Sequence, residues 1–255
     1  SVVTELSGID DPFRDIKDRS TELGLALLPE LRRTAVPPAI DGQLEALWFD
    51  RAVPYNLGDH NGKLNNLIVE NYLTIVRLLW DEEYLYAAFV CSTDAVETRF
   101  AKRDDPLYES ELCELMLAFP GGSRLLELSI APNGVVYDAL VRWNRDNRIE
   151  ADLSYDIPGL KSAVSLRQSA PGRLVWTAEL AIPWKALAPF RPGNGKLLRG
   201  NLLRYERLSD PELRSRNVPA AGTGDPAYLP LSLFPTQVRG WAAAPSSLGP
   251  LRLTE

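Results

Sequence analysis

The chain has 255 residues, of which 45% are hydrophobic and 24% charged, as is ordinary for a globular protein. Its net charge of −6 argues against nucleic acid as a partner, because a phosphate backbone needs a basic surface. No apolar run approaches the roughly 18 residues that a membrane-spanning helix needs. We therefore expect neither a nucleic acid nor a membrane among its partners.

The N-terminal sequence and the two cysteines do not determine the cellular compartment of the protein. The N-terminal sequence SVVTELSGIDDPF lacks the basic and then apolar pattern of a signal peptide. A chain that begins after the removal of such a peptide would look the same. Cys91 and Cys113 are too few for a disulfide framework or a cysteine-rich metal site. We expect both to be small buried core residues, with one bridge between neighbouring strands as the alternative.

The N-terminal part of the chain differs in composition from the rest. Residues 1–34 are interpreted as an extension with one or two helical turns, and residues 35–255 as one domain. Asp41 and Gly42 predict a turn early in this domain. Apolar residues at helical spacing then predict a short helix, which Trp48 would anchor.

From residue 71 onward the chain consists of short segments rich in β-branched and aromatic residues, separated by turn signals. The segments are TIVRLLW, EYLYAAFVC, LCELMLAF, RLLELSIA, GVVYDALVRW, RLVWTAELAI, LRGNLLRYERL and LGPLRL. The turn Pro132-Asn133-Gly134 predicts a hairpin. Many short strands without alternating helices indicate an all-β fold, an antiparallel β-sandwich of the immunoglobulin or jelly-roll type. The irregular stretch 209–240 is either a functional loop or disordered.

Each predicted strand has one apolar face and one face that carries a charge, because successive strand residues point to opposite sides. Glu114 lies opposite the apolar residues of its strand; in a later strand Tyr137 shares the apolar face and Arg142 the charged one. Two interpretations stay open: a solvated surface with cross-strand ion pairs, or a polar floor that discriminates hydroxyl patterns. The charged positions are Arg77, Glu114, Glu127, Arg142, Glu179, Arg204 and Glu206.

Two aromatic residues stand in loops that lead into strands. Tyr108 lies in the polar loop DDPLYESE, and Trp241 lies in a small, flexible segment before the closing strand. Aromatic residues in such places are poor core residues and good platforms for a ring, including the apolar face of a sugar. Trp143, at a strand end beside Arg142, is a third candidate.

The order of several segments carries a resemblance: AIDGQLEALWFDRA, LLWDEEYLYAAFVCSTDA, PLYESELCELMLAF, LELSIAPNGVVYDA, WTAELAIPWKAL, GNLLRYER and LGPLRL. This order resembles the family 9 carbohydrate-binding modules and their wider group, which includes haem-binding DOMON-type domains. The resemblance covers roughly residues 35–255, and WDEEYLY and AELAIPWKAL are its most specific parts. It implies a β-sandwich with a ligand site at one edge.

In sugar-binding members of that family, two aromatic residues clamp the sugar. The resemblance implies that Tyr108 and Trp241 form this clamp, with Tyr where a Trp is usual at the first position. It also implies that Glu114, six residues after Tyr108, is the hydrogen-bonding acid. Glu127 stands where the best-known sugar binders have a basic residue, which leaves the sugar open; Arg142 could supply the missing charge.

The other site predictions come partly from the same resemblance. Arg204 and Glu206 are candidates for fixing hydroxyl groups. Family members often bind structural calcium, for which Asp94 is the candidate ligand, together with the acids at Asp104 and Asp105. No other cofactor is predicted. The resemblance favours a secreted or periplasmic location.

We predict non-catalytic binding of a carbohydrate or similar ringed ligand. One alternative is an enzyme on the same scaffold, a cyclase, an isomerase or a glycoside-acting enzyme, using acids such as Glu114 and Glu127 in an enclosed pocket. No nucleophile motif surrounds a serine, and the single histidine, His60, is expected in an exposed loop. The other alternative is a haem site with Met116 and His60 as ligands, although Met116 is expected to serve packing.

Overall fold

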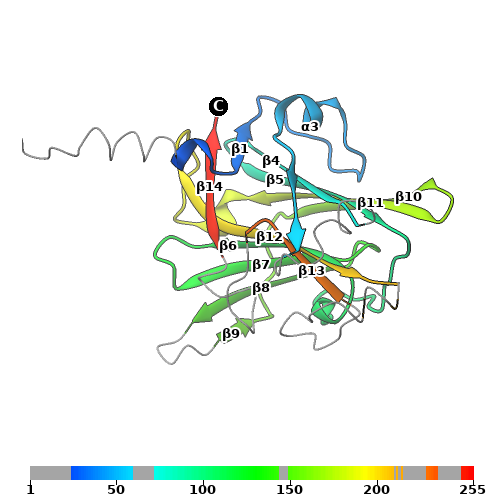
Figure 1. Ribbon diagram of the computed structural model, residues 1–255. Coiled ribbons are helices and arrows are strands. Elements are labelled where there is room, and N and C mark those ends of the chain that lie inside the picture. The colour runs from blue at the N-terminus through cyan, green and yellow to red at the C-terminus, as the bar shows by residue number, and fades with distance from the viewer. Residues whose placement is uncertain are drawn as a thin grey trace, which may run out of the picture.

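The computed structural model describes residues 24–59, 72–143, 149–209, 211, 214, 228–234 and 248–255. These residues form mostly strands, which curl into two packed layers (Figure 1). No helix within these ranges is long and apolar enough to cross a membrane. In chain order the elements are β1 (Glu30–Arg33), α3 (Ala46–Arg51), β2 (Tyr55–Asn56), β3 (Gly58–Asp59), β4 (Thr74–Trp80), β5 (Tyr84–Thr93), η1 (Leu107–Glu109), β6 (Leu112–Ala118), β7 (Arg124–Ile130), β8 (Val136–Trp143), β9 (Ile149–Asp152), β10 (Lys161–Ala170), β11 (Arg173–Pro183), η2 (Trp184–Leu187), β12 (Leu197–Arg207), β13 (Tyr228–Ser232) and β14 (Gly249–Thr254).

The strands follow one hydrogen-bonded path, β10-β11-β5-β4-β1-β14-β12-β6-β7-β8-β9. The first four make one layer and the last five make the other, while β1 and β14 join the layers along one side (Figure 1). β13 pairs with β12, β2 with β4, and β3 with β13. The predicted all-β sandwich is confirmed. Its pairings are antiparallel except that β1 runs parallel to both of its neighbours, β14 and β4.

β1 lies within the stretch that the sequence assigns to an N-terminal extension. Residues 24–26 are helical, as expected there, but residues 30–33 are a strand of the sheet. Only Leu31 in this strand is fully buried, so its four residues show no hydrophobic period that could reveal a strand. Residues 1–23 lie outside the described part of the chain.

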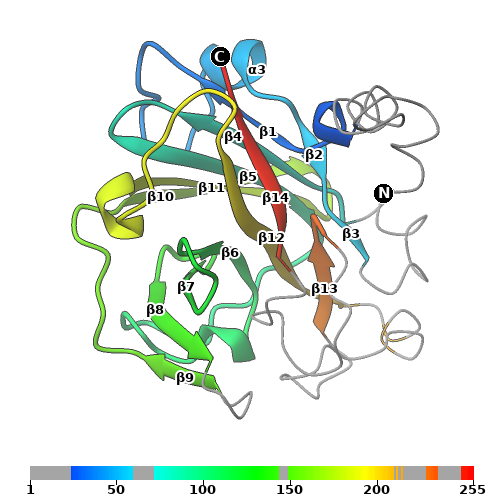
Figure 2. The same ribbon diagram turned by 90° about the vertical axis from the view of Figure 1, so that its left-hand side faces the viewer.

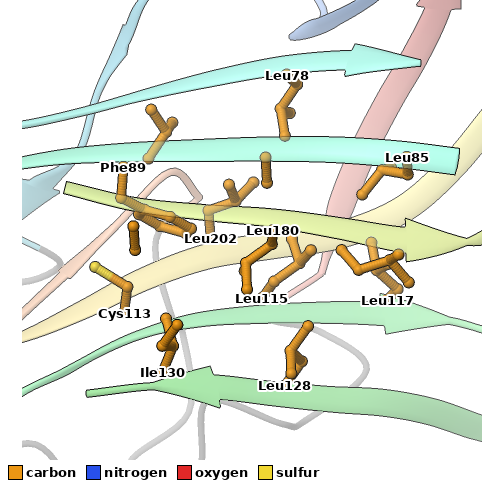
Figure 3. Packing of buried hydrophobic residues seen from close by; sticks show 14 of the residues in the cluster. Leu78, Leu85, Phe89, Cys113, Leu115, Leu117, Leu128, Ile130, Leu180 and Leu202 are labelled. Atoms are coloured by element: carbon orange, nitrogen blue, oxygen red, sulfur yellow. The ribbon is translucent and has the colours of Figure 1, made fainter. Parts of the chain in front are cut away.

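The main core lies between the two layers. Leu78, Leu85, Phe89 and Leu180 from one layer face Leu115, Leu117, Leu128 and Ile130 from the other (Figure 3). Each of these side chains is at most 1% exposed. Burial of such leucine and phenylalanine side chains stabilises a fold by roughly 1.5–3 kcal/mol each. The alternation predicted for strand 112–119 is confirmed, because Cys113, Leu115 and Leu117 point into this core.

The predicted hairpin at residues 132–134 is confirmed. It joins β7 to β8, and Gly134 adopts a φ of +84°, a region that glycine enters without steric cost. One long strand, β10, was not predicted. It lies at the edge of its layer and is largely exposed, so its small and polar residues carry no clear alternation.

The two cysteines meet in the core. Cys91 on β5 and Cys113 on β6 are free and fully buried, with their Sγ atoms 3.5 Å apart. The expectation of buried core thiols is confirmed, and the structure has no bridge between them.

Candidate functional site

The two outer faces of the sandwich are covered by different segments. α3 packs on the outer face of β4, β5 and β11, where Trp48 is fully buried and anchors the helix, as predicted. Glu179 on β11 accepts hydrogen bonds there from the backbone N–H groups of Asp41 and Gly42, at 3.2 and 2.7 Å, and from the indole N–H of Trp48, at 2.8 Å. Its carboxylate is fully used in holding this segment, so Glu179 is a structural acid.

Arg204 and Glu206 lie inside the sandwich, not on an outer face. Both side chains are completely buried and form an ion pair. Arg204 also binds Glu111 at 3.1 Å, and the indole N–H of Trp176 donates to the same carboxylate oxygen at 3.0 Å. Thr93 donates to Glu206 at 2.7 Å. This internal network pairs buried charges with each other, and it separates Arg204 and Glu206 from the other predicted ligand residues.

The outer face of β12, β6, β7 and β8 carries a different set of polar groups. The strand register aligns Leu203, Glu114, Ser129 and Tyr137 in one row across these four strands. Glu127 lies in the adjacent row, one diagonal step from Glu114. Cross-strand neighbours on one face are about 5 Å apart, so these side chains are in reach of one another. Glu114 and Glu127, which the sequence placed on one polar floor, are therefore neighbours.

The two carboxyl groups form a pair that has no countercharge among the described residues. Glu114 is 3% exposed and Glu127 6% exposed. Burial raises the pKa of Glu114 well above its usual range, and the adjacent Glu127 raises this pKa further. Burial also raises the pKa of Glu127, against the lowering effect of a hydrogen bond from Glu114. Glu114 is therefore the donor of the hydrogen bond between the two carboxyl groups, and Glu127 is the acceptor.

Few other groups satisfy this pair. Ser129 donates its hydroxyl to Glu114 at 3.2 Å. No Lys or Arg among the described residues forms an ion pair with Glu114 or Glu127. Glu179, on the opposite outer face, accepts three N–H donors, whereas among the described residues Glu114 accepts one hydroxyl donor, from Ser129. Buried polar groups that the fold leaves under-satisfied are common where a ligand binds.

Two tyrosines lie on the face that carries the carboxyl pair, and a third contacts one of them. Tyr108, on η1, is 47% exposed and meets the ring of Tyr137 edge to face, with ring centroids 6.4 Å apart. Tyr137 and Tyr205 are themselves 5% and 9% exposed. Burial raises the pKa of both buried phenols, and the charges of Glu114 and Glu127 raise it further. The two hydroxyl groups make no hydrogen bond within the described residues.

We call the group of Tyr108, Glu114, Glu127, Ser129, Tyr137 and Tyr205 the tyrosine–glutamate site. Tyr108, Glu114 and Glu127 were predicted as ligand residues from the sequence, whereas Ser129, Tyr137 and Tyr205 were not. Tyr137 was assigned to the apolar face of its strand, and the structure instead places it beside the acids. Tyr205 alternates with Arg204 and Glu206, and that alternation is the signal that could have placed it on the face of Glu114.

The two predicted arginine positions on β8 and β4 lie away from the tyrosine–glutamate site. Arg142 is exposed and points to the face of β8 opposite Tyr137, so it does not reach Glu114. Arg77 lies on β4 with its guanidinium 4.8 Å from the ring centre of Phe49, on the α3 side. Five of the seven charged strand positions are buried, so the interpretation of a solvated surface is wrong for them. These positions are Glu114, Glu127, Glu179, Arg204 and Glu206.

Trp143, Trp241 and His60 cannot be placed in the site. Trp143 ends β8, but its side chain lies outside the described part of the chain. Trp241 and His60 lie outside the described residues altogether. Met116 packs at 1% exposure with neighbours that include Leu125, Val141 and Leu203. The predicted packing role of Met116 is confirmed.

Asp94, the predicted calcium ligand, lies among hydrogen-bond donors. Its Oδ2 accepts hydrogen bonds from Tyr72, at 3.3 Å, and from Ser209, while Oδ1 is buried without a partner in the described residues. A calcium ion takes about six to eight oxygen ligands, commonly with several carboxylates. In the part of the chain that the structure describes, no three His, Cys, Asp or Glu side chains come together to hold a metal.

A separate hollow lies between the β4–β5 turn and η2. It has a volume of about 470 Å³ and is lined by Tyr84, Trp184 and Phe190, with Glu82, Lys185 and Arg191 at its rim. Trp184 is 4% exposed and donates its indole N–H to the backbone of Asp81 at 2.8 Å. This tryptophan serves the packing of the turn, as predicted, and does not offer a free ring face.

No protein-family model and no curated protein sequence matches the chain. Its fold is similar to solved structures. A candidate carbohydrate-binding protein from Bacteroides uniformis is 16% identical, over 88% of this chain and 97% of that one, with a TM-score of 0.64. A family 9 carbohydrate-binding module from Caldicellulosiruptor kristjanssonii, solved in complex with cellotriose, is 15% identical over 88% and 93%, with a TM-score of 0.50. The fold predicted from the resemblance is confirmed; its haem-binding branch is not.

Proposed function

We propose that the protein binds a carbohydrate or a similar ringed ligand at the tyrosine–glutamate site and performs no chemistry on it. The observation that carries this proposal is the nearly buried pair of Glu114 and Glu127 on the same face as Tyr137, whose ring meets the half-exposed ring of Tyr108 edge to face. The similar module from Caldicellulosiruptor kristjanssonii was solved with cellotriose, which supports a sugar as the ligand class.

The chemistry of the site suits a sugar. The ring of Tyr108 offers an apolar face, and stacking of this kind contributes on the order of 1 kcal/mol beyond area burial. Sugar hydroxyl groups both donate and accept, so they can donate to Glu127 and accept from the proton on Glu114. The buried hydroxyls of Tyr137 and Tyr205 supply further donors on the same face. Trp241 stays the predicted second clamp residue.

The geometry of the acids argues against a glycosidase. Retaining and inverting enzymes hold their two carboxyl groups about 5 Å or more apart, so that a sugar bond or a water fits between them. Glu114 and Glu127 instead hydrogen-bond to each other, and the pKa of each is raised by burial. This arrangement favours binding over hydrolysis.

Calorimetric titration with a panel of mono- and oligosaccharides, cellotriose included, tests the proposal. We expect heat with at least one sugar, and an affinity reduced about tenfold in Tyr108→Ala, the equivalent of about 1.4 kcal/mol. Phe49→Ala is the matched control, because Phe49 is 59% exposed and lies on α3, on the opposite side of the molecule (Figures 1 and 2). The absence of binding to every sugar, or equal losses in both variants, would show the proposal to be wrong.

A further inference from the structure

The tyrosine–glutamate site collects acids without a base. Among the described residues, the titratable side chains facing Glu114 are Glu127 from β7, Tyr137 from β8 and Tyr205 from β12. Tyr108 from η1 and Asp104 from the loop before it act on Tyr137 at the rim. Every one of these groups is an acid or a phenol.

A neutral ligand would bring no positive charge to the acid pair. Removing a carboxylate from water is costly unless a charge or several hydrogen bonds compensate, and among the described residues the one further donor to Glu114 is Ser129. One proton is therefore shared between the two groups. A ligand that brings its own positive charge would supply the missing compensation, because charge-assisted hydrogen bonds to carboxylates are short and strong.

The aromatic residues favour the same kind of ligand. A cation within about 6 Å of a tyrosine ring centre is attracted to the electrons of the ring. Tyr137 and Tyr205 lie on the face of the acid pair, and Tyr108 meets Tyr137 edge to face. The side chains of Tyr137 and Tyr205 are more than nine-tenths buried, and their hydroxyls form no hydrogen bond with the described residues. These two hydroxyls, which are separate from the acids, can form hydrogen bonds with a polar ligand.

We propose that the ligand of this site is an amino sugar, whose ammonium group lies between the carboxylates of Glu114 and Glu127 on the face that Tyr137 and Tyr205 share. The inference rests on the proposed function and narrows its ligand class. When the ammonium group enters, the shared proton leaves Glu114 for the solvent, so both carboxylates become ionised and the ammonium keeps its three N–H donors. No covalent bond forms or breaks.

Titration calorimetry with glucosamine, glucose and N-acetylglucosamine tests this inference at about pH 6, where a sugar amine is protonated but its acetylated form is neutral. We expect glucosamine to bind at least about tenfold more tightly than the two neutral sugars. Repeating the titration in buffers of different protonation enthalpy should show a release of about one proton per site. Glu127→Gln should abolish the preference for glucosamine, while Glu179→Gln, a buried acid on the opposite face, should keep it.

The possible failures are distinguishable. If glucose binds as tightly as glucosamine, or if Glu127→Gln keeps the full preference, the amino-sugar inference is wrong and the proposed function stands. If the folded protein binds none of the three sugars and no oligosaccharide, both are wrong. A thermal-melting curve for each variant establishes that it is folded before its affinities are compared.

Discussion

Trp48 donates its indole N–H to Glu179 at 2.8 Å, and this bond ties α3 to the outer face of β11. The same carboxylate accepts two backbone N–H groups from the Asp41–Gly42 turn. The segment from residue 41 to α3 therefore depends on one buried acid. Glu179 and the acids of the tyrosine–glutamate site look alike in the sequence, and their partners distinguish them.

Removal of the Glu179 carboxylate should destabilise the protein. Glu179→Ala leaves the indole N–H and two backbone N–H groups without an acceptor, and we expect the free energy of unfolding to fall by about 3–5 kcal/mol. Glu179→Gln keeps one acceptor oxygen and should lose less. Urea unfolding followed by tryptophan fluorescence measures both. A loss below about 0.5 kcal/mol in the alanine variant would contradict this structural role.

The internal ion pairs make a second prediction. Arg204→Met leaves Glu111 and Glu206 buried without a cation, and we expect a loss of about 3–5 kcal/mol in unfolding free energy. The control is Arg142→Met, at an exposed position, which should change the stability by less than about 0.5 kcal/mol. Equal effects of the two substitutions in urea unfolding would show that the internal network does not stabilise the fold.

The Asp41–Gly42 turn allows a test with matched glycines. Gly42 and Gly121 adopt similar φ values of +87° and +92°. A Cβ at Gly42 would lie 2.7 Å from the backbone carbon of Val164, whereas nothing lies within 4 Å of one at Gly121. We expect Gly121→Ala to cost about 1 kcal/mol for its backbone conformation alone, and Gly42→Ala to cost at least about 2 kcal/mol more because backbone atoms must move. Thermal melting measures the loss of stability in each variant. Equal losses would contradict the close approach of Gly42 to the backbone of Val164.

The pH dependence of stability should report the raised pKa of Glu114. A carboxyl group whose pKa is raised in the folded state binds its proton more tightly there than in the unfolded chain. Its contribution is therefore present at low pH, and is lost as the pH rises from about 4.3, the unfolded value, through the folded pKa. The loss is at most about 1.4 kcal/mol per pH unit for one proton.

Glu114→Gln removes this titration without changing the shape of the side chain. We expect its free energy of unfolding to vary less between about pH 5 and 8 than that of the unchanged protein, and to be higher at the upper end of this range. Urea titrations at each pH measure the difference. Parallel pH profiles for the two proteins would contradict this prediction, because they would show that folding does not raise the pKa of Glu114.

Much of the fold could be predicted from the sequence because its strands are regular. The strand from Leu112 alternates between core residues and Glu114, and the structure has this alternation. β1 and β10 were missed for opposite reasons. β1 is too short to show an alternation of apolar and polar residues. β10 is an exposed edge strand, so burial does not require apolar residues at alternate positions.

The site could be predicted only in part, because alternation gives the face of a strand but not what packs on that face. Tyr108 and Glu114 followed from their loop and strand positions. Arg204 has the same pattern as Glu114 in the sequence, but it points between the layers, where Glu111 pairs with it. Which side of a strand faces the partner layer depends on the sheet order, and one strand's sequence does not contain that order.

The most direct measurement is a crystal structure of the protein with the tightest-binding sugar of the titration panel. We predict a sugar ring against Tyr108, with its polar atoms within hydrogen-bonding distance of Glu114 and Glu127. A sugar bound instead in the hollow beside Tyr84 and Trp184, with the tyrosine–glutamate site unchanged, would contradict the proposed site.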